Sequence, residues 1–350
     1  MRRLRTWSAI LALGLLTVGG SAEAKDSFKI AWSIYVGWMP WGWAADHGIV
    51  KKWADKYGIE IEVVQINDYV ESINQYTAGG FDGCVMTNMD ALTIPAVGGV
   101  DSTALIVGDF SNGNDGIVSK TAKSVAELKG KSINLVELSV SHYLLARALE
   151  KAGLAERDVT VVNTSDADIV GVFTGSSDVE TVVTWNPLLS EVAAVPGAAK
   201  LFDSTQIPGE IIDLMVVNSA TLKKSPAFGK ALVGAWYETM AIMQGKDEAA
   251  IAARTEMAKA SGTDLAGFDA QLASTRMFWE PKDAVAFAQS PQLIETMDHV
   301  RTFSNSKGLM GGDMESVGIA FPGGRTLGAK GAIKLRFVDD YMKLAAEGGL

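Results

Sequence analysis

The sequence predicts an α/β protein whose chain forms two lobes joined by two crossings. Segments with the period of strands alternate with segments with the period of helices over residues 28–107, and the alternation resumes over 132–185. A stretch rich in turn-forming residues, 109–116, separates the two series and is expected to be neither helix nor strand. A later strand-like run, 211–218, provides the return crossing to the first lobe.

The first lobe is expected to start with a strand at 28–32. Pro40 then opens a helix over 40–56, because proline suits a first helical turn. The elements expected next are a strand at 59–66, a helix that Asn67 or Asp68 caps and Gly79-Gly80 ends, a strand at 81–87, a helix at 88–97 and a strand at 102–108.

The second lobe repeats this rhythm and the C-terminal part is mostly helical. The expected elements of the second lobe are strands at 132–138, 159–163, 179–185 and 201–202, and helices at 141–152 and 166–173. After residue 219 we expect helices at 225–244, 247–260, 264–275, 281–288, 290–306 and 330–347. The predicted divisions are a signal peptide at 1–24, lobe I at 25–112 and 214–350, and lobe II at 113–213.

The N-terminal residues have the pattern of a secretory signal peptide. Three arginines within the first five residues precede an apolar run at 9–18, and small residues follow at 21–24. The single cysteine, Cys84, lies far from this cleavage site, so we expect no lipid anchor at the mature N-terminus and no intramolecular disulfide. A bacterial periplasm is the expected location.

The charge balance of the mature chain excludes several classes of partner. Cleavage would remove three arginines and one glutamate and leave 28 basic against 40 acidic residues, a formal charge of −12. Nucleic acid and anionic membranes are poor partners for that balance. The three histidines are widely spaced and predict no metal site, and we expect neither a cofactor nor an oligomer.

Aromatic residues are concentrated in the turn after the first expected strand. Residues 32–48 contain four of the nine tryptophans and a tyrosine. In open α/β folds, ligands bind outside the carboxyl ends of the strands, where this turn would lie. Any one of these tryptophans could equally be a core residue, but the cluster beside Gly37 and Gly42 indicates a binding surface.

The ligand-facing loops lack cations and are rich in acids and amides. Lysine and arginine are absent from 30–50, 63–79, 82–119, 132–146, 158–199 and 201–222. The acids and amides there include Asp46, Asn67, Asp68, Asn88, Asp90, Asp109, Asp115, Glu137, Asn186 and Asp213. Tryptophan faces and carboxylates together bind nitrogenous cations, so guanidinium is the best-suited ligand, and urea or a carboxamide could use the same slot.

We therefore expect the ligand-binding residues to be Trp38, Trp41, Asn88, Asp90, Glu137, Ser139, His142 and Trp185, with Tyr35 and Asp68 as a second tier. Asp68 is also a natural helix cap, and Glu137 ends an apolar strand that should face the cleft. Asp213, inside an apolar run, could equally make a hinge hydrogen bond or touch the ligand.

Two short segments carry a resemblance to a known family. Residues 124–131, S-V-A-E-L-K-G-K, and Thr184-Trp185-Asn186-Pro187 resemble the "D-L-K-G-K" and "W-x-P" phrases of the nitrate/taurine class of ABC-transporter substrate-binding proteins. The resemblance implies a type II periplasmic-binding-protein fold, no catalytic residues, and partnership with an ABC permease and its ATPase in the inner membrane. Glu137-Leu138-Ser139 departs from the glycine-serine strand end common in that class.

Within that class the chain most resembles binding proteins found with urea- or guanidine-carboxylase systems. The implied function is capture of a small nitrogen compound between two lobes. A sulfonate, taurine or nitrate receptor and a binding lobe of a membrane sensor stay open as alternatives. An enzyme of the thiamine-pyrimidine type also stays open, although Cys84 alone does not supply the cysteine-rich segment of that branch.

Overall fold

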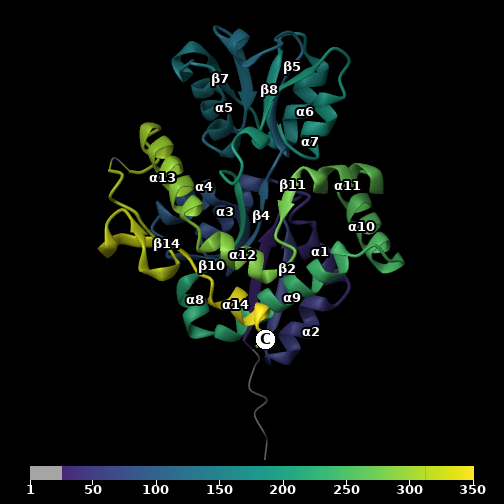
Figure 1. Ribbon diagram of the computed structural model, residues 1–350, viewed down its shortest axis with the longest axis vertical. Helices are drawn as coiled ribbons and strands as arrows, with labels where there is room; N and C mark the ends of the chain where they lie inside the picture. The colour runs from purple at the N-terminus through teal and green to yellow at the C-terminus, as the bar shows by residue number, and fades with distance from the viewer. Residues whose placement is uncertain (1–25, 312) are drawn as a thin grey trace, which may run out of the picture.

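The computed structural model describes residues 26–311 and 313–350, so the expected signal peptide lies outside the described residues. These residues form two α/β lobes, a smaller one at the top of Figure 1 and a larger one below it. Each lobe is built on its own sheet. Within the described residues, no helix is both long and apolar enough to cross a membrane.

The large lobe is built on a nine-stranded mixed sheet. Its order is β13-β12-β14-β4-β10-β3-β1-β2, with β11 paired to β4. β10 runs antiparallel to both β3 and β4. The strands are β1 (Ser27–Trp32), β2 (Glu60–Gln65), β3 (Gly83–Thr87), β4 (Ser102–Ser111), β10 (Ile212–Asn218), β11 (Thr275–Met277), β12 (Gly318–Ala320), β13 (Thr326–Leu327) and β14 (Ile333–Phe337).

The small lobe is built on a five-stranded sheet of order β7-β6-β8-β5-β9. Its strands are β5 (Asp115–Ser119), β6 (Ser132–Leu135), β7 (Thr160–Asn163), β8 (Thr181–Trp185) and β9 (Ala199–Asp203). Its helices are α5 (Val140–Lys151), α6 (Asp166–Gly175) and α7 (Leu188–Ala193). β9 lies at the edge of the sheet, which confirms the edge strand expected at 201–202.

Helices surround the large sheet. They are α1 (Met39–Asp46), α2 (Ile49–Lys56), α3 (Tyr69–Thr77), α4 (Asn88–Ala91), α8 (Ser219–Lys224), α9 (Pro226–Gln244), α10 (Glu248–Ala260), α11 (Leu265–Ala273), α12 (Pro281–Ala288), α13 (Pro291–Ser306) and α14 (Asp340–Ala346). The single helix expected at 40–56 is two helices, because Gly48 adopts a left-handed φ of 74° and turns the chain between them.

The prediction of a helix at 330–347 is wrong over the first half of that range. Residues 333–337 form β14, which pairs in parallel with β4. Leu335 and Phe337 are buried, and lysine and arginine alternate with the apolar residues of this segment. That spacing has the period of a strand, which the helical pattern of the neighbouring residues obscured.

The turn expected at 109–116 is also mostly strand. β4 continues to Ser111 and β5 begins at Asp115, so only residues 112–114 separate the two strands. Pairing with β10 on one side and with β8 on the other keeps Asp109 and Asp115 in extended backbone despite their turn propensity. The chain returns to the large sheet between β9 and β10, at residues 204–211.

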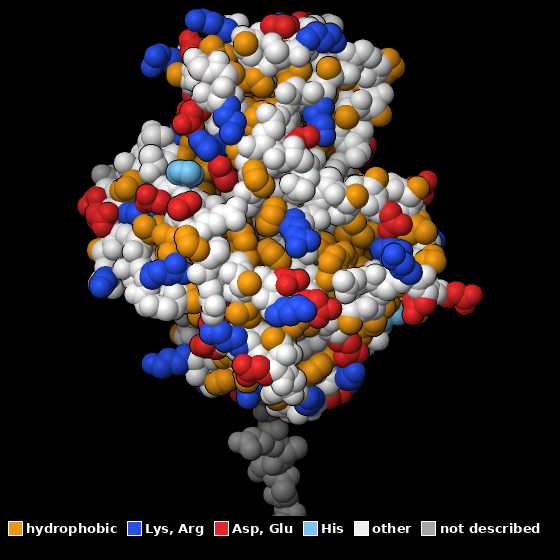
Figure 2. Space-filling model, in the orientation of Figure 1, with side chains coloured by type: hydrophobic (Ala, Val, Ile, Leu, Met, Phe, Trp, Pro, Cys, Tyr) orange, Lys and Arg blue, Asp and Glu red, His pale blue; other side chains and the backbone are white. Residues whose placement is uncertain are grey.

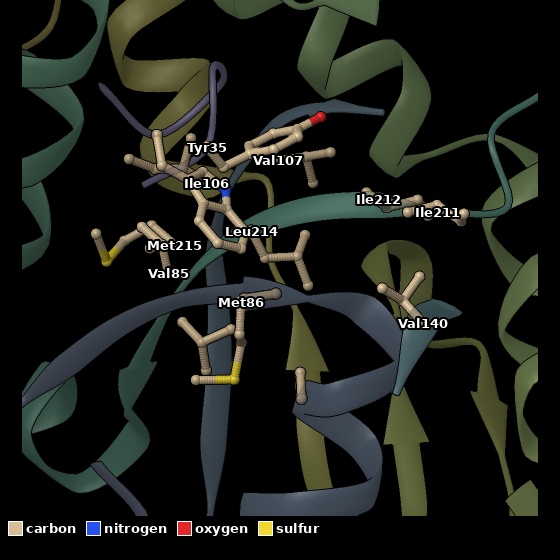
Figure 3. Packing of buried hydrophobic residues seen from close by; sticks show 14 of the residues in the cluster. Tyr35, Val85, Met86, Ile106, Val107, Val140, Ile211, Ile212, Leu214 and Met215 are labelled. Atoms are coloured by element: carbon tan, nitrogen blue, oxygen red, sulfur yellow. The ribbon is translucent and has the colours of Figure 1, made fainter. Parts of the chain in front are cut away.

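The core of the large lobe fills the space around its central strands. Figure 3 shows Val85, Ile106, Leu214 and Met215 together, from β3, β4 and β10. These side chains are almost wholly buried, and each is worth about 1.5–3 kcal/mol of hydrophobic stabilisation. The face in Figure 2 carries acidic and basic side chains interspersed over both lobes.

Candidate functional site

The aromatic turn lies where β1 ends and the two lobes meet. Trp38 precedes α1, and Pro40 lies in the first turn of that helix. The turn passes very close to β4, since a Cβ added to Gly37 would lie 2.4 Å from Asp109 Oδ2 and 2.8 Å from the Tyr35 ring. Glycine at position 37 therefore lets the aromatic turn approach a buried carboxyl group.

A first cavity, here the Trp236 cavity, is lined by residues of the large lobe. Tryptophans from the aromatic turn and α9, apolar residues from the central strands, and two aspartates surround it. Its lining residues are Trp38, Trp41, Val85, Ile106, Gly108, Asp109, Asp213, Leu214, Met215 and Trp236.

A second cavity, here the Trp185 cavity, adjoins the first. Trp38 and Asp213 line both cavities. Its lining residues are Tyr35, Trp38, Tyr69, Thr87, Asp115, Val140, Trp185, Ile211 and Asp213. Asp115, Val140 and Trp185 belong to elements of the small lobe, so both lobes contribute to this cavity.

Aromatic rings form the walls of both cavities. Trp38 stacks on Tyr69 with ring centroids 5.4 Å apart, and the edge of Tyr69 faces Trp185 at 5.9 Å. Trp41 stacks on Trp236 at 5.2 Å. The π faces of such rings attract positive charge, so the walls suit a cationic or planar nitrogenous ligand.

Three buried aspartates face these aromatic walls. Asp109 and Asp213 are partners in the register of β4 and β10, and Asp115 is the partner of Trp185 in the small sheet. All three are at most 3% exposed. The Tyr35 hydroxyl lies 3.4 Å from Asp109 Oδ1, and the Asn114 side-chain amide donates to that hydroxyl oxygen at 3.2 Å.

Burial makes these three carboxyl groups hard to ionise. It raises the pKa of Asp109 to about 7 and that of Asp115 to about 7. The pKa of Asp213 rises well above its usual range, through burial and then through the neighbouring Asp109 carboxylate. Among the described residues no lysine, arginine or histidine pairs with any of the three. A bound cation would be the missing partner.

A fourth buried aspartate positions an aromatic wall. The Tyr69 hydroxyl donates to Asp90 Oδ2 at 2.6 Å, and the Thr87 hydroxyl donates to the same oxygen at 2.8 Å. Burial raises the pKa of Asp90 to about 6, and these two hydrogen bonds oppose the rise. Asp90 lines neither cavity itself, but it fixes the ring of Tyr69, which does.

The structure brings part of the expected site together. Trp38, Trp41, Trp185 and Tyr35 line the cavities. The other expected residues line neither cavity. They are Asn88, Asp90, Glu137, Ser139, His142 and Asp68.

Asp68 and Ser139 cap helices, and Asn88 forms hydrogen bonds at the return crossing between the lobes. Asp68 accepts from the Glu71 amide at 2.9 Å as the cap of α3, and Ser139 accepts from the Ser141 amide as the cap of α5. The Asn88 side chain donates to the Glu210 carbonyl and accepts from the Ile212 amide, at the return crossing. These three side chains therefore form hydrogen bonds with backbone groups.

Glu137 and His142 line neither cavity and have partners elsewhere. Glu137 is exposed, and its backbone amide donates to Asn163 Oδ1. His142 is 3% exposed, with Nε2 2.9 Å from a Glu156 oxygen and Nδ1 accepting from the Leu138 amide. Burial lowers the pKa of His142 to about 4.

Sequence reasoning did not choose Asp109, Asp115, Asp213 and Trp236 as site residues. The three acids did carry a signal, because each interrupts or begins a run of buried strand residues, and a carboxyl group in such a run needs a partner. For Trp236 the sequence carried no such signal. This residue lies on α9, where the pattern is that of any buried helix.

Two α/β lobes joined by two crossings, with a cavity whose walls come from both lobes, have the periplasmic-binding-protein fold. The chain belongs to the NMT1/THI5-like family, whose sequence pattern matches residues 48–250. Family membership agrees with the broad class to which the sequence resemblance pointed.

Curated relatives match a limited part of the chain. A candidate binding protein of Brucella abortus (strain 2308) is 29% identical over 149 residues, 42% of this chain and 45% of the relative. A candidate aliphatic sulfonates-binding protein of Escherichia coli (strain K12) is 29% identical over 130 residues, 37% of this chain and 40% of the relative. The chain thus spans less than half the length of these curated relatives.

Solved structures share the fold over most of the chain. The alkanesulfonate-binding protein SsuA from Xanthomonas axonopodis pv. citri, bound to MOPS, has a TM-score of 0.66 and 18% identity over 83% of this chain and 96% of its own. SsuA from Escherichia coli has a TM-score of 0.66 and 20% identity over 82% of this chain and 94% of its own. The desulfurization enzyme DSZB has a TM-score of 0.59 and 13% identity over 93% of this chain and 100% of its own.

Proposed function

We propose that the protein is a solute-binding protein that captures a small nitrogen compound of the guanidine, urea or amide type between its lobes. One observation carries the proposal: Asp109, Asp115 and Asp213 are buried beside tryptophan and tyrosine rings and, among the described residues, have no cationic partner. A ligand that donates N–H groups to carboxylates and lies flat against aromatic rings supplies what this arrangement lacks.

Capture would couple ligand binding to the relation between the lobes. The Trp185 cavity has walls from both lobes, so a ligand in it favours the arrangement in which the lobes approach each other. The ligand changes the free-energy difference between the open and closed states by the difference in its free energy of binding to the two states. Export to the periplasm and delivery to an ABC permease with its ATPase are part of this proposal.

The second candidate is a receptor for a sulfonate, taurine or nitrate. It is favoured by the name of the Escherichia coli relative and by the MOPS bound to a protein of the same fold. The residues that line the two cavities oppose it, because they include three aspartates and neither lysine nor arginine. An anion about 4 Å from one ionised carboxylate meets a repulsion of about 4 kcal/mol at an effective dielectric constant of 20.

An enzyme on this fold is the remaining alternative, since DSZB shares the architecture. The only cysteine, Cys84, is buried in β3, and burial raises its pKa to about 12. A thiol that stays protonated at neutral pH is a poor nucleophile. Neither cavity is lined by a cysteine or a histidine, so binding accounts for their residues better than covalent catalysis does.

Thermal shift of the mature protein tests the choice of ligand class. The panel is guanidinium at a concentration too low to denature, methylguanidine, urea, acetamide, taurine, an alkanesulfonate and nitrate. A ligand that binds only the native state at a hundredfold excess over Kd stabilises it by about 2.7 kcal/mol. We expect a rise in Tm with a guanidinium, urea or amide compound. A rise with taurine, sulfonate or nitrate alone would establish the second candidate.

A further inference from the structure

Among the described residues, four buried polar atoms on residues of the Trp236 cavity have no hydrogen-bond partner when both of its aspartates are ionised, whereas a proton held between Asp109 and Asp213 would pair their carboxyl groups with each other. The four atoms are Trp38 Nε1, Trp236 Nε1, Asp109 Oδ2 and Asp213 Oδ2. The four side chains are at most 6% exposed. Buried polar groups are nearly always paired in folded proteins, so a group of four around one cavity indicates a ligand that pairs with them.

The four atoms divide into two kinds that one simple cation cannot satisfy. An indole N–H can only donate, and an ionised carboxylate can only accept. Guanidinium carries N–H donors and no acceptor, so it would pair with Asp109 and Asp213 and leave both indole N–H groups unpaired. A ligand that also carries an acceptor would satisfy both kinds, and a buried donor left unpaired is costly.

We propose that the ligand is a carbamoyl compound, that is, a planar molecule with a –C(=O)–NH₂ group. Its carbonyl oxygen accepts from the indole N–H groups of Trp38 and Trp236, and its N–H groups donate to Asp109 and Asp213. This inference rests on the proposed function, narrows its ligand class, and places the carbamoyl group in the Trp236 cavity, which shares Trp38 and Asp213 with the Trp185 cavity.

The residues in the walls of the cavity agree with a flat ligand of this kind. Val85, Ile106, Leu214 and Met215 enclose it on the side of the sheet, where Figure 3 shows them packed together. The stacked rings of Trp41 and Trp236 are a further wall. Apolar walls that carry a few polar groups are typical of a small-molecule site.

Calorimetric titration at pH 8 with two monocations tests the inference, because only one of them has an acceptor. The ligands are carbamoylguanidinium and guanidinium, with urea as a neutral carbamoyl compound. We expect wild-type protein to bind carbamoylguanidinium at least tenfold more tightly than guanidinium. Trp236→Phe and Trp38→Phe, which remove an N–H and keep a ring, should weaken carbamoylguanidinium binding about tenfold and change guanidinium binding less than twofold.

Trp41→Phe is the matched control, because Trp41 lines the same cavity but its N–H is not among the unpartnered buried donors. It should change the affinities for both cations by the same factor. The melting temperature of each ligand-free variant verifies folding.

Two further results would overturn the inference in distinguishable ways. Equal affinities for the two cations in wild type, or an equal loss of both in the Trp→Phe variants, would overturn the carbamoyl class and leave the proposed function standing. Binding of sulfonate or nitrate alone, or of none of these compounds, would overturn both.

Discussion

Asp109 on β4 and Asp213 on β10 are partners in the strand register, and both are buried beside Trp38 at the junction of the lobes. Two carboxyl groups so close cannot both ionise cheaply without a cation. This pair of residues makes the proposed site sensitive to pH and to charge-neutralising substitutions.

We expect a guanidinium-type cation to bind more tightly as the pH rises from 6 to 8. The pKa values of Asp109 and Asp115 are about 7, and the cation needs their ionised forms. At one pH unit below its pKa a carboxyl group is only about 10% ionised, so affinity should fall about tenfold at pH 6 for each such group. Calorimetry from pH 6 to 8 measures this, and a flat profile would contradict it.

Stability of the ligand-free protein should fall as the pH rises from 6.5 through 7 and level off towards 8. A carboxyl group whose folded pKa is about 7 and whose unfolded pKa is near 4 stabilises the fold below about pH 4, and this contribution is lost as the pH rises through 7. His142, whose pKa burial lowers to about 4, acts oppositely below about pH 6.5. Thermal melts should therefore show a Tm that falls from pH 6.5 through 7 and levels off towards 8, and a saturating cation should remove the fall.

Asp115→Asn and Glu137→Gln together distinguish the buried site from the site expected from sequence. Asp115 is 3% exposed and lines the Trp185 cavity, whereas Glu137 is exposed and lines neither cavity. A lost charge-assisted hydrogen bond is worth about 1.5–3 kcal/mol, so Asp115→Asn should weaken binding about 10- to 100-fold. Glu137→Gln should change it less than twofold. The reverse order would restore Glu137 as a ligand residue.

Gly37→Ala should reduce both stability and ligand affinity. Its Cβ would lie 2.4 Å from Asp109 Oδ2, so either the aromatic turn or the carboxyl group must move. We expect a loss of about 1–3 kcal/mol in the free energy of unfolding, measured by urea denaturation. Gly171→Ala in α6 is the control, because open space surrounds that position and the change should stabilise by about 0.5–1 kcal/mol. Wild-type behaviour of Gly37→Ala would refute the close approach.

Lys307→Ala should weaken ligand binding without touching either cavity. Lys307 follows α13 of the large lobe and pairs with Glu156 of the small lobe, close to where Phe303 meets Tyr143 at 5.4 Å. Loss of a contact between the lobes raises the free energy of the closed arrangement, so affinity should fall about two- to fivefold. Lys282→Ala on α12 is the control. Equal affinities of the two variants would show that this contact does not support closure.

The sequence indicated the fold well because strands and helices alternate with clear periods. The C-terminal strand β14 was missed since its five residues lie next to a helix. The end of β4 and the start of β5, within 109–116, have the composition of a loop because aspartate, asparagine and glycine favour turns. In both cases pairing with a distant strand, which no local pattern records, decided the backbone.

The aromatic half of the candidate site followed from the sequence, but its acidic half did not. Trp38 precedes α1 and Trp41 lies in its first turns, three residues further on, so their proximity is local. Asp109, Asp115 and Asp213 come together only through the register of β4 with β10 and through the junction of the two sheets. Glu137 has the same residue chemistry but faces solvent, a difference that the order of the residues does not reveal.

The most direct measurement is calorimetric titration of guanidinium, carbamoylguanidinium and taurine into wild-type protein and Asp213→Asn at pH 8. We expect at least one of the two nitrogen cations to bind wild type, to lose about 100-fold in affinity in Asp213→Asn, and taurine to bind neither protein. Taurine binding to wild type with unchanged affinity in Asp213→Asn would contradict the assignment of this buried acidic site to a nitrogenous ligand.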